Sequence, residues 1–131
     1  MAYWLFKQEP SCYSFSDLER DGETVWDGVA NALALKYLRQ VKQGDEVFFY
    51  HTGQEKAVVG IMKAVTDAVA DQATKAVTVQ VQAVKRLQKP VSLSMIKQDA
   101  SLKDFELTRL PRLSIIPVTS SQWRRILAKS R

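Results

Sequence analysis

Aromatic side chains alternate with hydrogen-bonding side chains over the first 31 residues of the chain. Half of its twelve aromatic residues lie there: Tyr3, Trp4, Phe6, Tyr13, Phe15 and Trp26. The polar residues between them include Lys7, Gln8, Glu9, Asp27 and Asn31. A nucleobase stacked on an aromatic ring gains about 1–3 kcal/mol, and an amide or carboxylate can read the edge of an extruded base. The segment therefore predicts a pocket for a nucleobase.

The same aromatic residues could instead belong to the core. Trp4 and Phe6 lie in an apolar run over residues 2–7 that is typical of a central strand, so packing explains them without a ligand. Trp26 is different, because it stands beside Asp27 in an expected loop and joins no periodic apolar stripe. We therefore expect Trp26 to face the ligand.

Catalytic and metal-binding motifs are few. Cys12 and His51 are the only residues of their types, and a thiol next to an imidazole could act as a nucleophile with its base. One cysteine excludes an intramolecular disulfide and a cysteine-based zinc site, and no glycine-rich phosphate loop is present. We expect no metal and no cofactor. An enzyme acting on nucleotides or RNA, through Glu9, Asp27 or the Cys12–His51 pair, is the alternative hypothesis.

The positive charge of the chain is concentrated in its last quarter. The net charge is +5, and residues 1–100 carry 12 basic and 12 acidic side chains. Residues 101–131 carry seven basic and two acidic side chains, and the candidate phosphate contacts among them are Arg109, Arg112, Arg124 and Arg125. A basic surface favours an anionic partner such as nucleic acid, although cations near the end of a helix also stabilise its dipole.

Short elements of both kinds must position these residues. Strands are expected over residues 2–7, 46–51, 57–64, 75–85 and 113–118. Pro117 in the last of them indicates a sheet edge or a strand end. Helices are expected after a cap at Ser14 or Ser16, from Asn31 to about Gln43, from Ser92 through Ile96, and after a cap at Ser120 or Ser121. Residues 23–30 are expected to form a loop. This order predicts an α+β fold, with a small curved sheet or barrel flanked by helices.

Length and hydropathy limit the class of protein. A chain of 131 residues is typical of a single domain, here 1–131. No apolar run approaches the roughly 18 residues that span a membrane, and the first residues do not form a signal peptide. We therefore expect a domain of the bacterial cytosol (or of the nucleus, in a eukaryote) that has no membrane partner.

Five segments together resemble one known family. They read YWLFKQEP at residues 3–10, TVWDGVAN at 24–31, GDEVFFYH at 44–51, VVGI at 58–61 and RLSIIPVTSSQW at 112–123. In this order and spacing they are similar to the EVE domain, a PUA-like family related to the YTH domains that bind methylated adenine in RNA. The resemblance implies a PUA-like pseudobarrel with a curved, mixed or antiparallel sheet of about five or six strands. It also implies a non-catalytic pocket for a modified base in DNA or RNA.

The resemblance assigns roles to individual residues. The family's motif falls on the following positions: Trp4, Lys7, Glu9, Pro10, Trp26, Gly28, Val29, Asn31, Tyr50 and His51. By similarity, Trp26 would form an aromatic wall of the pocket, with Asp27 beside it as a further contact. The side chains of Lys7, Glu9 and Asn31 would make polar contacts. Tyr50 and His51 would close the rim.

Two positions depart from the family. Ala30 stands where EVE domains usually have arginine, and residues 68–71 read Ala-Val-Ala-Asp where a Tyr-Pro pair is common. The first change removes a guanidinium that could contact phosphate. The second, at Val69, removes an aromatic ring from the other side of the pocket. These losses favour a third hypothesis, a protein–protein adaptor with a degenerate pocket.

Overall fold

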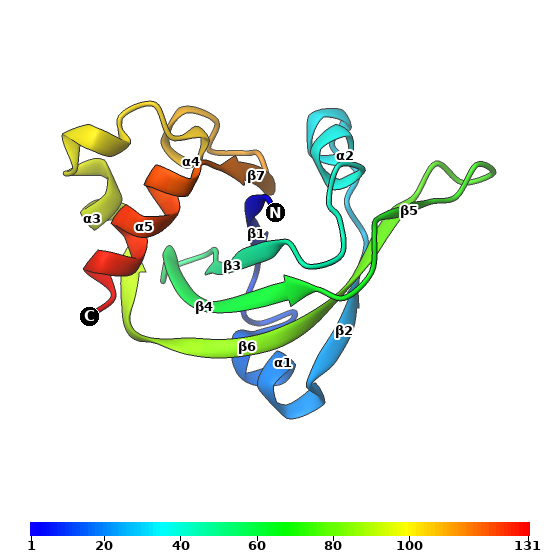
Figure 1. The fold of residues 1–131 in the computed structure, drawn as a ribbon, viewed down its shortest axis with the longest axis horizontal. Coiled ribbons are helices and arrows are strands. Elements are labelled where there is room, and N and C mark those ends of the chain that lie inside the picture. Colours follow the sequence, from blue (N-terminus) through cyan, green and yellow to red (C-terminus); the bar gives the residue numbers. More distant parts are fainter.

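A strongly curved sheet forms the centre of the computed structural model, which describes residues 1–131 (Figure 1). Its strands run in the order β2-β6-β4-β3-β1-β7, and the short β5 pairs with β6 outside this path. The strands are β1 Tyr3–Gln8, β2 Glu23–Trp26, β3 Glu46–His51, β4 Ala57–Ala64, β5 Val69–Ala70, β6 Val77–Ser92 and β7 Ile115–Val118. β1 and β3 are parallel, and every other pair is antiparallel. The expected α+β fold with a curved, mixed sheet is confirmed. The two-residue β5 is a seventh strand, where about five or six strands were expected.

Helices cover this sheet on two sides. They are α1 Phe15–Asp21, α2 Ala32–Leu38, α3 Leu93–Lys97, α4 Glu106–Arg109, α5 Ser120–Lys129 and a 3-10 helix at Ala100–Leu102. α2 packs against β7, at one edge of the sheet, and against β6, next to the other edge, so it bridges the curved sheet and completes a PUA-like pseudobarrel. α3, α4 and α5 lie together on the other side, at the left of Figure 1.

The central strand β1 presents alternate side chains to opposite sides, as the period of two in a strand requires. Trp4 and Phe6 point to one side, where the ring centre of Phe6 lies 5.3 Å from that of Trp26. Tyr3 points to the other side and stacks at 4.7 Å on Trp123 of α5. Buried hydrophobic side chains from both sides form one core of 34 residues. Trp4 and Phe6 are therefore core residues, as the packing explanation predicted.

Several expected elements are confirmed. The strands expected over 46–51 and 57–64 match β3 and β4 at both ends and pair as a hairpin. Ser14 caps α1, and Asn31 caps α2 by accepting the backbone N–H of Ala34. β7 is an edge strand that pairs only with β1.

The expectation of a loop over residues 23–30 is wrong for its first half. Glu23–Trp26 forms β2, in which the β-branched Thr24 and Val25 favour an extended backbone. β2 pairs only with β6, at the edge of the sheet, and Val25 there is 53% exposed, so the strand carries little hydrophobic pattern. Trp26 therefore ends a strand instead of lying in a loop.

α2 ends at Leu38, five residues before the expected end at Gln43. The chain after it is fixed by the buried carboxylate of Asp45, which accepts hydrogen bonds from the backbone of Lys42 and from Nε1 of Trp4. This buried carboxylate holds the chain in a turn where the apolar pattern alone predicts five more helical residues.

Two further boundaries differ from expectation. β6 continues to Ser92 instead of ending near residue 85, with register shifts that mark bulges where it curves against β4. The last helix is capped by Thr119, in a capping box with Gln122, and not by Ser120 or Ser121.

Candidate functional site

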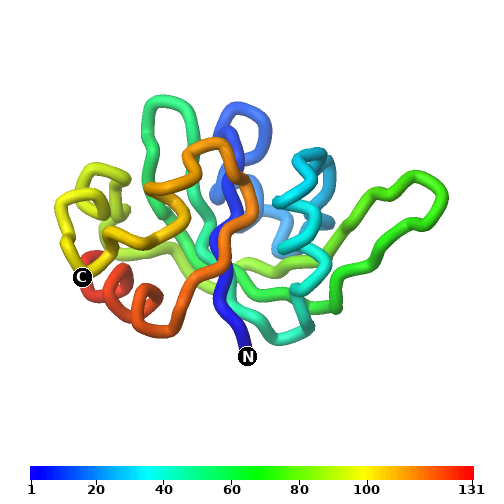
Figure 2. Tube along the Cα trace, turned by 90° about the horizontal axis from the view of Figure 1, so that it is seen from above, coloured from blue at the N-terminus to red at the C-terminus, as the bar shows by residue number.

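The family's motif residues gather where β1 and β3 end side by side. The parallel register pairs Lys7 with Tyr50 and Gln8 with His51. Figure 2 shows the segment after β1, the turn between β3 and β4, and the segment before β7 along this one edge, with the N-terminus at the opposite edge. The predicted residues of the first and third motifs are thus neighbours.

These residues lie on opposite sides of the sheet. Lys7 and Tyr50 point toward the side of α3 and α4, where they line one hollow with Leu93 and Leu107. Trp26 points to the opposite side, where its ring centre lies 5.5 Å from that of Phe49. The motif residues therefore do not line a single pocket.

Trp26 and Trp4 are both buried in the core. Trp26 is 5% exposed and packs between Phe6 and Phe49. Trp4 is 4% exposed, and its Nε1 donates to Asp45 at 2.9 Å. The expectation that Trp26 lies in a loop with its ring free for a ligand is therefore wrong for this conformation. Trp26 instead anchors the start of the segment 27–31.

His51 has protein partners on both ring nitrogens. Its Nε2 accepts the backbone N–H of Phe15 at 3.0 Å, which requires an unprotonated Nε2. Nδ1 then carries the proton and donates it to Glu55 Oε1 at 2.7 Å. Because neither nitrogen is free, His51 cannot act as a base for the exposed thiol of Cys12.

Glu9 and Pro10 shape the turn after β1. The carboxylate of Glu9 accepts hydrogen bonds from Ser11 and from the hydroxyl of Thr52, at 3.3 Å in the second case. Its oxygens lie so close to Gly53 that a Cβ there would stand 2.8 Å from one of them. Glu9 therefore ties the end of β1 to the β3–β4 turn.

Lys7 and Tyr50 lie against one another near the ends of the neighbouring strands β1 and β3. Nζ of Lys7 donates to the carbonyl of Pro111 at 2.8 Å and lies 5.7 Å from the centre of the Tyr50 ring. Partial burial lowers the pKa of Lys7, and burial raises the pKa of Tyr50 to about 12. Tyr50 is therefore a neutral phenol at physiological pH.

Two hollows flank Pro111. One, of about 310 Å³, is basic and has these lining residues: Lys7, Tyr50, Thr52, Gly53, Lys56, Leu93, Lys97, Leu107 and Pro111. The other, of about 340 Å³, is mainly apolar and is lined by Asn31, Leu33, Leu110, Pro111, Arg112 and Leu113. Both are at the lower end of the size range of small-molecule sites.

Asn31 and Arg112 bring free polar groups to the apolar hollow. The Asn31 carbonyl oxygen accepts the N–H of Ala34 at 3.0 Å, so its amide NH₂ is left without a protein partner. Arg112 is exposed and forms no ion pair. The carboxylate of Asp27, in the segment between Trp26 and Asn31, is also exposed.

The other candidate arginines are placed differently. Arg109 pairs with Glu106 at 2.7 Å, and Arg125 pairs with Asp99 at 2.6 Å. Hydrogen bonds from Arg125 and Ser101 hold the pKa of the Asp99 carboxyl well below its usual range. The guanidinium of Arg125, a candidate phosphate contact, is therefore already engaged by a carboxylate of the same chain.

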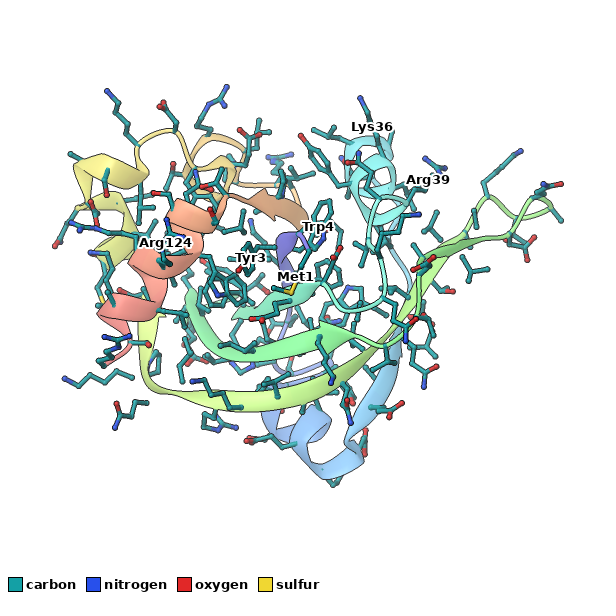
Figure 3. All side chains as sticks on the ribbon, viewed as in Figure 1. Met1, Tyr3, Trp4, Lys36, Arg39 and Arg124 are labelled. Carbon is teal, nitrogen blue, oxygen red and sulfur yellow. The ribbon has the colours of Figure 1, made fainter.

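Arg124 is unpaired but lies at the wrong end of β1. Its neighbour Trp123 stacks on Tyr3, at the start of the strand. β1 is six residues long, so its two ends lie about 16 Å apart. Figure 3 shows Arg124 on α5, with Lys36 of α2 and Arg39, which directly follows this helix, across from it.

Sequence reasoning did not identify Lys56, Lys97 or the apolar wall of Leu33 and Leu110. Lys56 and Lys97 come from the part of the chain with no net charge, so composition gives no signal for them. The tertiary structure alone brings them to Lys7.

The departures from the family lie at the surface. Ala30 is exposed next to Asn31. Val69, in β5, is 61% exposed on a hairpin that projects from the body (Figures 1 and 2).

Some other kinds of site lack a counterpart in the structure. A hollow of about 600 Å³ is lined by Asp99, Arg125 and Lys129, and its one carboxylate forms ion pairs with both cations. No group of three or more His, Cys, Asp or Glu side chains is placed to hold a metal ion. None of the helices is long and apolar enough to cross a membrane.

Known proteins share this sequence and fold. The model of the EVE domain matches residues 2–129. Thymocyte nuclear protein 1 of Rattus norvegicus is 31% identical over 96% of this chain and 72% of that protein. The structure of a Rhodopseudomonas palustris protein is 34% identical with a TM-score of 0.93, over 99% of this chain and 93% of that one. The crystal structure of human THYN1 in complex with DNA containing 5-methylcytosine is 28% identical with a TM-score of 0.93, over 100% of this chain and 98% of that one.

Proposed function

Because the chain belongs to the EVE domain family, we propose that it is a non-catalytic module that binds nucleic acid and recognises a modified base. The DNA held by human THYN1 makes 5-methylcytosine the first candidate for that base. RNA carrying a methylated base is the second candidate partner. Such partners would place the protein in the bacterial cytosol or in a nucleus.

The free amide of Asn31 beside an apolar hollow is the observation that carries this proposal. The carbonyl oxygen of this amide accepts the N–H of Ala34, so the orientation of the amide is fixed and its NH₂ group has no protein partner. The NH₂ group can therefore donate to an acceptor on the edge of an extruded base. Leu33 and Leu110 offer apolar contact to a methyl group on that base. Arg112 can contact the adjoining phosphate.

In this proposal the buried motif residues act indirectly. Trp26 fixes the segment 27–31 that carries Asn31, and His51 ties the end of β3 to the start of α1. Arg112 can also supply the guanidinium that is absent at Ala30, because it lines the hollow with Asn31. Loss of the family's arginine therefore need not mean loss of phosphate contact.

The test is a titration of two DNA duplexes that differ in one 5-methyl group, followed by fluorescence anisotropy at fixed salt. Burial of one methyl group contributes about 0.8 kcal/mol, so we expect about a fourfold preference for the methylated duplex. Leu33→Ala should bring this preference close to parity. Asn31→Ser retains a capping oxygen but loses the amide, and should weaken binding to both duplexes about fivefold.

Gln40→Ser is the matched control, because it removes another exposed amide close to the end of α2. It should leave both affinities unchanged. Equal affinity of the wild-type chain for the two duplexes, and for RNA with and without a methylated base, would contradict the proposed function. The mass of the oligonucleotide after incubation should be unchanged, and a shifted mass would favour the enzyme hypothesis instead.

A further inference from the structure

The basic hollow at the end of β1 and β3 is left unused by the proposed base pocket. Its charged residues are Lys7, Lys56 and Lys97, and none of the three forms an ion pair with a carboxylate. Three ammonium groups around one concave surface repel each other and raise the local concentration of anions. The surface therefore favours the binding of a negatively charged ligand.

Backbone contacts hold two of these lysines beside each other. The carbonyl of Lys56 accepts the N–H of Leu93 at 2.8 Å, which joins the β3–β4 turn to the first residue of α3. Lys97 lies four residues later on α3, about one helical turn along. Lys56 also has a φ of 49°, a conformation that a non-glycine residue adopts only where its surroundings fix it.

Lys7 and Tyr50 complete the wall with free hydrogen-bond donors. Nζ of Lys7 gives one of its three N–H groups to the Pro111 carbonyl, which leaves two. The hydroxyl of Tyr50, which stays neutral, has no protein partner and is not sealed from solvent. Burial without a counter-charge lowers the pKa of Lys7, and an anion in the hollow would reverse that effect.

The carboxylates near this hollow are already engaged. Glu9 accepts hydrogen bonds from Ser11 and Thr52, and Glu55 accepts one from His51. Neither carboxylate forms an ion pair with Lys7, Lys56 or Lys97. The three positive charges of the hollow therefore outnumber the two negative charges of Glu9 and Glu55 near it.

We propose that the hollow of Lys7, Tyr50, Lys56 and Lys97 binds one backbone phosphate of the nucleic acid. This inference rests on the proposed function, because the strand must lie across this edge of the sheet. Pro111 is the common wall of the two hollows, so the phosphate and the base would be neighbours along the same strand. The lysines then supply affinity, and the Asn31 hollow supplies discrimination.

The experiment compares the wild-type chain with a Lys56→Asn, Lys97→Gln double variant. Both side chains are exposed, and asparagine tolerates the left-handed backbone at residue 56, so the variant should keep the wild-type melting temperature. Binding to the methylated and unmethylated duplexes is measured between about 50 and 200 mM NaCl. The slope of log K against log salt should fall by about 1 for both duplexes, and their affinity ratio should stay the same.

The matched control is a Lys42→Gln, Lys63→Gln double variant, which removes the same charge at the opposite end of β3. Its slope should equal that of the wild type. An unchanged slope in the site variant, or an equal fall in the control, would overturn the phosphate assignment. Loss of the methyl preference with an unchanged slope would also overturn it, because the hollow would then belong to the base pocket.

A second arm locates the phosphate by replacing single linkages near the modified base with neutral methylphosphonates. The wild-type chain should lose affinity at one linkage adjoining the base, and the double variant should be insensitive there. Uniform losses at every linkage in both proteins would overturn the inference. The salt slope is measured on the unmethylated duplex too. If the wild-type chain shows no preference for the methylated base, that result contradicts only the proposed function. Absence of binding to either duplex and to RNA with or without a methylated base would contradict both.

Discussion

Two hydrogen bonds of His51 exclude the nucleophile–base pair that the residue types alone leave open. The sequence places one cysteine and one histidine in the chain, which leaves a nucleophile–base pair open. In the structure, the Phe15 backbone and Glu55 occupy both ring nitrogens of His51, and Cys12 is left without a base. A pattern of residue types can nominate such a pair, but only geometry shows whether the lone pair is available.

Trp26 illustrates the same point for an aromatic residue. The sequence predicts that Trp26 faces a ligand from a loop, but its ring packs between Phe6 and Phe49, which lie far from it in the sequence. We predict that Trp26→Ala opens a cavity between Phe6 and Phe49 and lowers the free energy of unfolding by about 3–5 kcal/mol. Urea denaturation measures this loss directly.

Val25→Ala provides the comparison, since Val25 precedes Trp26 on the same strand and is 53% exposed. It should change the free energy of unfolding by less than about 0.5 kcal/mol. Equal, small losses in the two variants would show that Trp26 is not a core residue in solution.

At the scale of elements, the parallel pairing of β1 with β3 creates the site. It brings the ends of two strands from distant parts of the chain to one edge, where the segment before β7 closes over them. The individual strands were predictable from their apolar patterns. Their pairing was not, because strand order depends on contacts between residues such as Lys7 and Tyr50 that lie far apart in sequence.

Two ion pairs of the buried Asp99 carboxylate join two further elements. Asp99 precedes the 3-10 helix, and its carboxylate binds Arg125 and Lys129 of α5. The bond from Arg125 is the main reason why the pKa of Asp99 in the folded chain lies below its ordinary value of 3.8. This stabilisation is fully present above pH 3.8 and is lost as the pH falls below it toward the folded-state pKa.

We predict that Asp99→Asn lowers the free energy of unfolding at pH 7 and makes it less dependent on pH between about 5 and 2. Urea denaturation across this range measures both effects. Part of the acid dependence should remain, because Asp17 and Asp21 of α1 also have lowered pKa values. An acid profile identical to that of the wild type would contradict the role of Asp99.

At the scale of the whole molecule, the basic residues of the last quarter of the chain lie at several separate places in the structure. Arg112 borders the candidate site, Arg109 and Arg125 are paired within the fold, and Arg124 lies at the other end of β1. The fold class and the family were predictable, because caps, alternation and motif order are local signals. The basic hollow was not, because its lysines come from distant segments.

The central claim is that a modified nucleic acid binds across the edge where β1 and β3 end. Chemical-shift changes in ¹H–¹⁵N NMR spectra, recorded as a 5-methylcytosine duplex is added, test it most directly for a chain of 131 residues. We predict the largest shifts at the following backbone amides: Asn31, Leu33, Gly53, Lys56, Lys97 and Arg112. Shifts concentrated instead around Tyr3 and Arg124, at the start of β1 and on the neighbouring α5, would contradict it.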